Sequence, residues 1–343
     1  MSFASAPLGA LAAIFAVAGA LILVCGLRMT GLADRIADRT GLGEALVGGV
    51  LLGAATSLSG TIVSFTSALD GRASLAFSNA VGGIAAQTAF LAVADLLYRR
   101  ANLEHAAAEL ANVLQGVVLM LLLALPILAR TGPEVSVWGI HPMSIILFLI
   151  YLGSLRLVRD AREVPMWVPV ETRETRRDSP EEPETGGQET RALLLRFAAL
   201  MLVMGVSGWL VAGVAGAAID RFALRASLVG ALLTAVVTSL PELVTTLAAV
   251  RRGALQLAVG GIIGGNTFDV LFLTVSDLGY REGSLYHAIG ADGLFWLAVG
   301  LVMTAVLTLG LLMRQREGPA GIGLESAALL GIYGGAVGLQ ALL

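Results

Sequence analysis

The chain carries one segment twice, and this internal repeat restricts its fold more than any other feature. Residues 46–99 align without a gap on residues 228–281 after a shift of 182 positions, and 19 of the 54 pairs are identical. Repeats of this size in an apolar chain are typical of transporters, which place their substrate site where two repeats meet. We therefore expect two related halves with a site between them.

Composition indicates an integral membrane protein. Hydrophobic residues make up 57% of the chain and charged residues only 14%, a balance unlike that of soluble domains. The net charge is −3 and no long basic patch lies outside one loop, so nucleic acid is not an expected partner. The expected partner is the lipid bilayer.

Apolar stretches predict ten membrane spans, which must be helices because a backbone in lipid has to satisfy its own hydrogen bonds. They lie at 8–27, 44–68, 73–97, 107–129, 137–158, 194–217, 226–250, 255–276, 291–313 and 322–343. The first lacks the positively charged start of a secretory signal and is long enough to span a bilayer, so we expect a retained helix. Short turns at 70–72 and 251–253 separate the paired helices of each repeat.

The predicted fold class is an all-α polytopic membrane protein with ten transmembrane helices in two inverted five-helix repeats. Five spans is an odd number, so the second half enters the membrane from the opposite side. We expect a first membrane repeat at 1–158, a cytoplasmic flexible linker at 159–193 and a second membrane repeat at 194–343. The linker combines charge, proline and glycine without apolar periodicity. Arginine is richer in the loops on the linker's side, which predicts a cell-membrane protein with both termini extracytoplasmic.

Two acidic residues in the second repeat are the main functional puzzle. Glu242 and Asp269 lie in apolar spans, within roughly 6 Å of the membrane midplane by helical rise, whereas the first repeat has Gly60 and Gln87 at those positions. A bare carboxylate there costs several kcal/mol, so it indicates a functional site. The alternative is a protonated or hydrogen-bonded acid that seals a helix contact.

The residues before Glu242 offer further oxygen ligands. Pro241 lacks a backbone donor and crowds the carbonyl of Val237, which frees carbonyls on the turn with Thr238 and Ser239. Carbonyl, hydroxyl and carboxylate oxygens are the ligands that Ca²⁺ and Na⁺ prefer. The two hydroxyls could instead bond within their own helix and only bend it. The glycines at 260, 261, 264 and 265 would let the eighth span approach the seventh closely.

Residues 238–242 (TSLPE), the short loop to Gly253 and residues 264–269 (GGNTFD) resemble the second α-repeat of the sodium/calcium and cation/proton exchanger superfamily. The first repeat resembles the same pattern more weakly, through residues 56–58 (TSL) and 81–83 (VGG). Ten spans with a cytoplasmic loop between the fifth and sixth fit the architecture of that superfamily.

The resemblance implies roles for individual residues. Glu242 would be a direct ligand of Ca²⁺ and would also serve Na⁺, and Asp269 would hold a central water, proton or cation. The remaining cation-binding set would comprise backbone carbonyls at Thr56 and Thr238, hydroxyls at Ser57 and Ser239, and Gln87 in the place of a paired asparagine or aspartate. No cofactor is implied; Ca²⁺ and Na⁺ or H⁺ would be transported ligands.

The first repeat departs from the family pattern. Members of the family normally carry Pro-Glu in both repeats, but here the first copy reads Ser59-Gly60. The serine of the family's G-S-N step is Gly83 in one repeat and Gly265 in the other, and Ile84 replaces an asparagine. At most two formal negative charges remain. Because Ca²⁺ prefers six to eight oxygens with several carboxylates, we expect weakened Ca²⁺ affinity relative to a symmetric site.

A second acidic pair, Asp95 and Asp277, recurs near the end of each repeat. Each has an arginine four residues later, Arg99 and Arg281, a spacing that allows contact on one helical face. We expect structural ion pairs at the rim, with a cation-attracting vestibule as the alternative.

These observations predict a secondary active antiporter that exchanges Ca²⁺, or another cation, for Na⁺ or H⁺ by alternating access. Two alternatives remain open. One is a monovalent cation/proton transporter with a degenerate Ca²⁺ site, and the other is a non-transporting membrane scaffold or sensor of the same fold. An enzyme is not expected, because no nucleophile–base pair or histidine ligand set is present.

Overall fold

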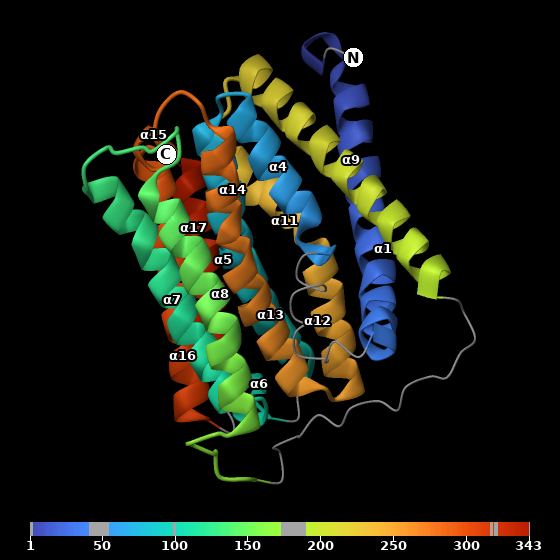
Figure 1. The fold of residues 1–343 in the computed structure, drawn as a ribbon, viewed down its shortest axis with the longest axis vertical. Helices are drawn as coiled ribbons and strands as arrows, with labels where there is room; N and C mark the ends of the chain where they lie inside the picture. Colours follow the sequence, from blue (N-terminus) through green and yellow to red (C-terminus); the bar gives the residue numbers. More distant parts are fainter. Residues whose placement is uncertain are drawn as a thin grey trace.

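The computed structural model describes residues 3–40, 55–98, 101–172, 190–315, 318 and 322–342. Each of the ten predicted spans contains at least one helix within these residues (Figure 1). The first half contains α1 (Leu8–Thr40), α4 (Leu58–Leu69), α5 (Ala73–Tyr98), α6 (Leu103–Ala106), α7 (Leu110–Thr131) and α8 (Pro142–Glu163). The second half contains α9 (Thr190–Phe222), α10 (Ala226–Leu228), the π-helix η3 (Val229–Thr234), α11 (Ala235–Thr238), α12 (Leu240–Arg252), α13 (Leu255–Asp269), α14 (Leu271–Gly279), α15 (Leu285–Ala288), α16 (Ala291–Met313) and α17 (Leu324–Leu342). A short 3₁₀ helix, η1 (Phe3–Ser5), precedes α1.

Seven of the described helices are long and apolar enough to cross a membrane, and the bent pair formed by 226–238 and 240–252 makes an eighth. The other two predicted spans coincide with α4, a shorter apolar helix, and with α17. Of the predicted span at 44–68, residues 44–54 lie outside the described part of the chain. Both chain ends lie at one end of the bundle, and α6 lies at the other (Figure 1).

The centre of the bundle is α5. Every residue from 75 to 89 is buried, as expected of a helix that is apolar all round and surrounded by other helices. It packs against α4, η3, α12, α13, α16 and α17. The first helices of the two halves, α1 and α9, pack on each other beside this core (Figure 1).

The two repeats share their local geometry. The turns predicted at 70–72 and 251–253 are confirmed, with Gly71 at φ 71° and Gly253 at φ 85°, a left-handed conformation that glycine adopts without strain. Ser57 (φ −84°, ψ 0°) and Ser239 (φ −97°, ψ 5°) precede α4 and α12 in nearly the same backbone conformation. The chain bends by 47° at Ser239, and Pro241 lies in the first turn of the helix that follows. Both repeats therefore interrupt their helices at the equivalent position.

The glycines of α13 do not have the role that the sequence suggested. A Cβ at Gly260 would meet Asn112 of α7, one at Gly264 would meet Gln115 of α7, and one at Gly265 would meet Gln87 of α5. These glycines therefore face α7 and α5 and not the preceding span. The prediction of a close approach to the seventh span through them was wrong, because helical spacing alone does not identify the neighbour.

A tight glycine contact lies between the repeats. A Cβ on Gly82 of α5 would lie 2.4 Å from the Cα of Ala231 in η3, so backbone would have to move. We expect Gly82→Ala to destabilise the protein by about 1–3 kcal/mol through overpacking, measured as a lower Tm in detergent. Gly261→Ala is the matched control, since nothing lies within 4 Å of its Cβ position. Equal Tm values for the two variants would contradict this account.

Candidate cation-binding site

Glu242 and Asp269 lie next to helix breaks in the interior of the protein. Glu242 is 6% exposed in the first turn of α12, and Asp269 is 2% exposed as the last residue of α13. Within the described part of the chain, neither carboxylate oxygen of Glu242 has a hydrogen-bond partner, and Oδ1 of Asp269 has none. Unpartnered buried carboxylate oxygens are costly, so this arrangement favours a cation ligand over a sealed helix contact.

Gln87 and Asp269 occupy the same position in the two repeats, and they touch. Nε2 of Gln87 donates to Oδ2 of Asp269 over 2.7 Å and to Oγ of Ser239 over 3.1 Å. Oε1 of Gln87 has no partner among the described residues. The Gln87 amide of the first repeat thus bonds to two residues of the second repeat, Asp269 and the Ser239 at its helix break. The amide oxygen of Gln87 stays available to a cation.

The predicted residues of the first repeat lie beside these acids. The Thr56 side chain lies close to the carboxylate of Glu242, and the Ser57 side chain lies close to that of Asp269. Both residues are buried. The structure therefore brings residues from the first helix break to the carboxylates that follow the second.

Two alternatives were predicted for the hydroxyls of Thr238 and Ser239, and each residue follows a different one. The Thr238 hydroxyl donates to the carbonyls of Thr234 (2.9 Å) and Ala235 (3.2 Å), so it stays within its own segment. The Ser239 hydroxyl faces Gln87 instead. Of the two hydroxyls, only that of Ser239 points to the acidic site, which leaves Thr238 its backbone carbonyl.

Phe272 fills the space that a side chain at position 60 would need. A Cβ on Gly60 would lie 2.6 Å from Cε2 of Phe272 and 3.6 Å from the Thr238 hydroxyl. The Gly60 carbonyl accepts a hydrogen bond from Asn79 (3.1 Å), which also donates to Ser64 (2.9 Å). An aromatic ring of the second repeat therefore occupies the space beside position 60, and the nearby Asn79 amide bonds to the backbone and to Ser64.

Two residues near the site were absent from the predicted set. Nδ2 of Asn266 donates to the hydroxyl of Thr88 over 2.9 Å, and its Oδ1 has no partner among the described residues. Tyr151 of α8 is buried and is an electrostatic neighbour of Asp269. The motif at 264–269 contains Asn266 and could have indicated it. No local pattern marks Tyr151, which arrives from another helix.

The ligand set holds two carboxylates and otherwise neutral oxygens. No group of three or more histidine, cysteine, aspartate or glutamate side chains gathers to hold a metal ion within the part of the chain that the structure describes. The glycines at 83 and 265 line the site, because a Cβ there would meet Ser239 and Gln87, respectively, at 3.6 Å. The candidate site therefore carries at most two formal negative charges, those of Glu242 and Asp269.

In the second acidic pair, Asp277 does not form the predicted ion pair. Asp277 accepts hydrogen bonds from the backbone of His141 and the hydroxyl of Ser144, both at 2.7 Å, and no Asp277–Arg281 pair is present among the ion pairs of the described residues. Asp95 likewise accepts backbone N–H groups, while Arg99 lies outside the described residues. Buried carboxylates can form several charge-assisted bonds to N–H groups, which are stronger than an exposed ion pair.

Comparison with known proteins identifies the family. The family described as "Sodium/calcium exchanger protein" matches residues 10–158 and 191–342. The chain belongs to this family. Its predicted membership is thus confirmed, and the family is one of membrane transporters and not of enzymes.

Individual relatives agree with this assignment. Inner membrane protein YrbG of Escherichia coli (strain K12) is 30% identical over 275 residues, which cover 77% of this chain and 78% of that protein. Sodium/calcium exchanger MaX1 of Methanosarcina acetivorans is 32% identical over 93 residues, or 27% of each protein. A structure of the sodium-calcium exchanger NCX_Mj has a TM-score of 0.62 and 17% identity, and covers 96% of this chain and 97% of that one. This shared fold confirms the predicted all-α inverted-repeat architecture.

Proposed function

We propose that this family member is a secondary active antiporter that exchanges Ca²⁺, or another cation, for Na⁺ or H⁺. The observation that carries the proposal is the pair Glu242 and Asp269, buried beside helix breaks with three carboxylate oxygens that lack partners among the described residues. Such oxygens suit a dehydrated cation. The sodium/calcium exchanger named among the relatives and the NCX_Mj fold support a cation as cargo.

Exchange follows if the two ions share a ligand. Glu242 would bind either ion, so the two could not occupy it together. Asp269, Gln87, Ser57 and Ser239 would complete the site with the carbonyls of Thr56 and Thr238. An empty site would leave unpaired carboxylates in a closed interior, which disfavours crossing without cargo.

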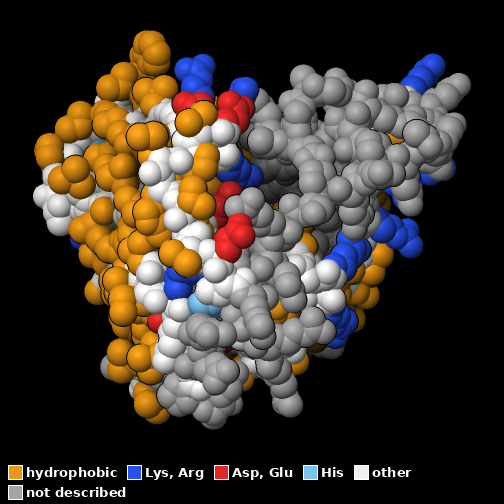
Figure 2. All heavy atoms as spheres, turned by 90° about the horizontal axis from the view of Figure 1, so that it is seen from below, with side chains coloured by type: hydrophobic (Ala, Val, Ile, Leu, Met, Phe, Trp, Pro, Cys, Tyr) orange, Lys and Arg blue, Asp and Glu red, His pale blue; other side chains and the backbone are white. Residues whose placement is uncertain are grey.

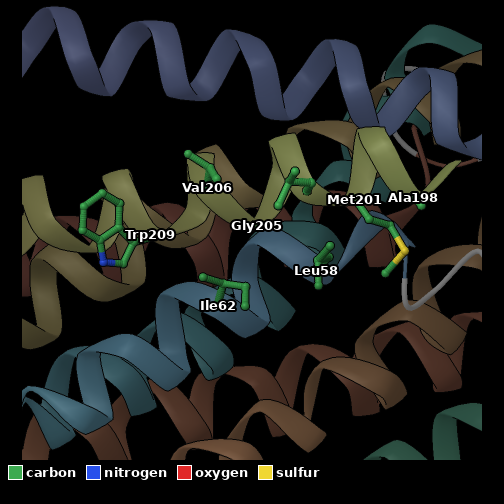
Figure 3. Close-up of a pocket in the computed structure, with 8 residues that line it drawn as sticks. Leu58, Ile62, Ala198, Met201, Gly205, Val206 and Trp209 are labelled. Atoms are coloured by element: carbon green, nitrogen blue, oxygen red, sulfur yellow. The ribbon is translucent and has the colours of Figure 1, made fainter. Parts of the chain in front are cut away.

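Alternating access would come from movement of α1 and α9 against the core. These helices share an apolar cluster of their own that includes Ile22, Met29 and Met204. An apolar groove of about 500 Å³ lies between α9 and α4, lined by Leu58, Ile62, Met201 and Trp209 among others (Figure 3). No acidic side chain lines the groove. It leaves room at the contact across which α9 would slide.

The protein would sit in the cell membrane with the linker in the cytoplasm. The relative YrbG is named an inner membrane protein, and arginine is richer in the loops on the linker's side. Seen from the end that carries α6, arginine and acidic side chains gather on the end face while the flank on the left of the view is largely apolar (Figure 2). This pattern fits a bilayer around the flanks and both termini on the extracytoplasmic side.

A monovalent cation/proton antiporter is the second candidate. It is favoured by Phe272, which occupies the place of a repeat-one acid, and by Gln87, which is neutral where Asp269 is charged. A singly charged ion needs less compensation than a divalent one.

The deciding experiment is uptake of radioactive calcium by purified protein in liposomes under a Na⁺ gradient, a pH gradient or neither. We expect uptake that one gradient drives and that is absent without a gradient. Protein-free liposomes and Glu282→Gln, which changes an exposed acid outside the site, are the controls. Sodium flux driven by a pH gradient, without calcium uptake, would select the monovalent candidate. Flux of neither ion would reject transport and favour a scaffold.

A further inference from the structure

The internal repeat extends beyond residues 46–99 and 228–281 to two polar clusters at opposite ends of the molecule. In the first, Asp95 accepts from the backbone N–H of Leu103 (2.7 Å) and of Gly323 (3.0 Å). In the second, Asp277 accepts from the N–H of Leu285 (3.4 Å) and His141 (2.7 Å). Every one of these partners is related to its counterpart by the same shift of 182 positions. We name the clusters the α6 clasp (Asp95, Leu103, Glu104, Gly323, Glu325, Ser326) and the α15 clasp (Asp277, Leu285, Tyr286, His141, Ser144).

One difference between the clasps lies at the buried residue that contacts the serine. In the α15 clasp, the Tyr286 hydroxyl pairs with Ser144 over 2.8 Å. In the α6 clasp, the equivalent residue is Glu104, whose Oε1 accepts from Ser326 over 3.1 Å. Glu104 is 2% exposed, and its Oε2 has no hydrogen-bond partner within the described residues. One clasp therefore holds a neutral phenol where the other holds a second carboxyl group.

The unpartnered oxygen faces other carboxylates. A Cβ at Gly323 would lie 3.3 Å from Oε2 of Glu104 and 3.3 Å from Oε2 of Glu325, and a Cβ at Gly310 of α16 would touch both side chains. Asp95 and Glu325 both act on Glu104 electrostatically in the same direction. Three carboxyl groups thus converge where a negative charge on Glu104 is unfavourable.

The other charged groups around the clasp are engaged elsewhere by the contacts that the structure gives. His105, on α6 itself, contacts the Arg314 carbonyl (2.6 Å) and the Thr172 hydroxyl (2.9 Å). The Arg314 guanidinium, after α16, donates to the carbonyls of Val170 (2.7 Å) and His105 (3.4 Å). α13 also packs against α6, and its sequence has no titratable residue before its last position, Asp269.

We propose that Glu104 is a proton-binding site that adjusts transport to the pH on the membrane face bearing the linker. A proton from the aqueous phase on that face adds to Oε2, which converts the carboxylate to a neutral acid able to donate one hydrogen bond to a neighbouring carboxylate. The clasp then holds α5, α6 and α17 together. Loss of the proton leaves three mutually repelling carboxylates and loosens it. Val170 and Thr172 lie in the predicted linker, so the linker is attached to the same assembly.

Burial and the charge of Asp95 raise the pKa of Glu104 to about 7. Because this is above the usual value of 4.5, the folded protein keeps the proton over a range in which the unfolded chain has lost it. The stability of the folded state therefore falls as pH rises from about 4.5 to about 7 and then levels.

The first test is the Tm of purified wild-type protein and Glu104→Gln in detergent at pH values across this range. The wild type should lose several degrees more than Glu104→Gln as pH rises, since glutamine cannot titrate. Glu325→Gln, a change at the half-buried neighbour, is the matched control and should keep a pH-dependent Tm. If Glu104→Gln fails to fold, Ser326→Ala should move the midpoint to higher pH, because it removes a donor to the charged form. Wild-type pH dependence in the variant used would overturn the proton site.

The second test measures transport and rests on the proposed function. Cation flux should change with pH around a midpoint near 7 on the linker's side, and Glu104→Gln should fix the flux at its low-pH value. Loss of the Tm effect with an unchanged flux profile would overturn the link to transport but leave the proton site in place. The Tm measurement requires no transport, so a failure of the proposed function is distinguishable from a failure of this one.

Discussion

Glu242→Gln should abolish gradient-driven cation uptake while leaving the protein folded. The substitution keeps the shape of the side chain and removes its charge. Truncating one partner of a buried charge pair costs about 2–5 kcal/mol, so the affinity for cation should fall at least about 30-fold. If Glu242 serves both ions, uptake driven by either gradient should be lost together. The measurement is initial calcium or sodium uptake in liposomes at several cation concentrations.

The stability of the variant separates a ligand from a packing residue. Neither Glu242 carboxylate oxygen has a hydrogen-bond partner among the described residues, so neutralising it removes a buried charge without breaking a bond. The Tm of the cation-free variant should equal or exceed that of the wild type. Added cation should raise the Tm of the wild type only. A variant that transports normally, or that unfolds, would show that Glu242 is not a cation ligand.

The general architecture could be predicted because it depends on features that act along the chain. Ten apolar stretches and two glycine turns follow from the cost of placing polar backbone in lipid. The matching breaks at Ser57 and Ser239 follow from the repeat itself. Glu242 and Asp269 could be predicted as candidate site residues because a carboxylate in an apolar span is energetically costly. Their individual roles stay predictions.

What could not be predicted depends on contacts between distant segments. Nothing in the alignment of the repeats places Phe272 against Gly60, because a repeat relates equivalent positions and does not reveal which ones touch. The spacing of Asp277 and Arg281 suggested an ion pair, whereas the carboxylate accepts hydrogen bonds from the backbone just before α8 and at the first residue of α15. The sequence contains a signal for this arrangement outside the aligned segments. Leu103, His105 and Ser144 recur 182 positions later as Leu285, His287 and Ser326.

Restoring the missing acid should convert the site to stronger calcium binding, but only if space is made for it. A Cβ at Gly60 alone would meet the Phe272 ring at 2.6 Å, so Gly60→Glu should destabilise the protein by about 1–3 kcal/mol. The double variant Gly60→Glu with Phe272→Ala removes the clash and places a third carboxylate near Glu242 and Asp269. Because Ca²⁺ prefers several carboxylate oxygens, its affinity should rise relative to that of Na⁺.

The matched control is Gly60→Gln with Phe272→Ala, which has the same volume and no added charge. Calcium binding to purified protein, measured by calorimetry with and without sodium, should be at least about 30-fold tighter in the glutamate variant than in the glutamine variant. Equal affinities would mean that position 60 does not reach the cation, and the charge deficit of the first repeat would then have another cause. Tighter binding would show that a glycine and the aromatic ring opposite it limit the charge that this site can hold.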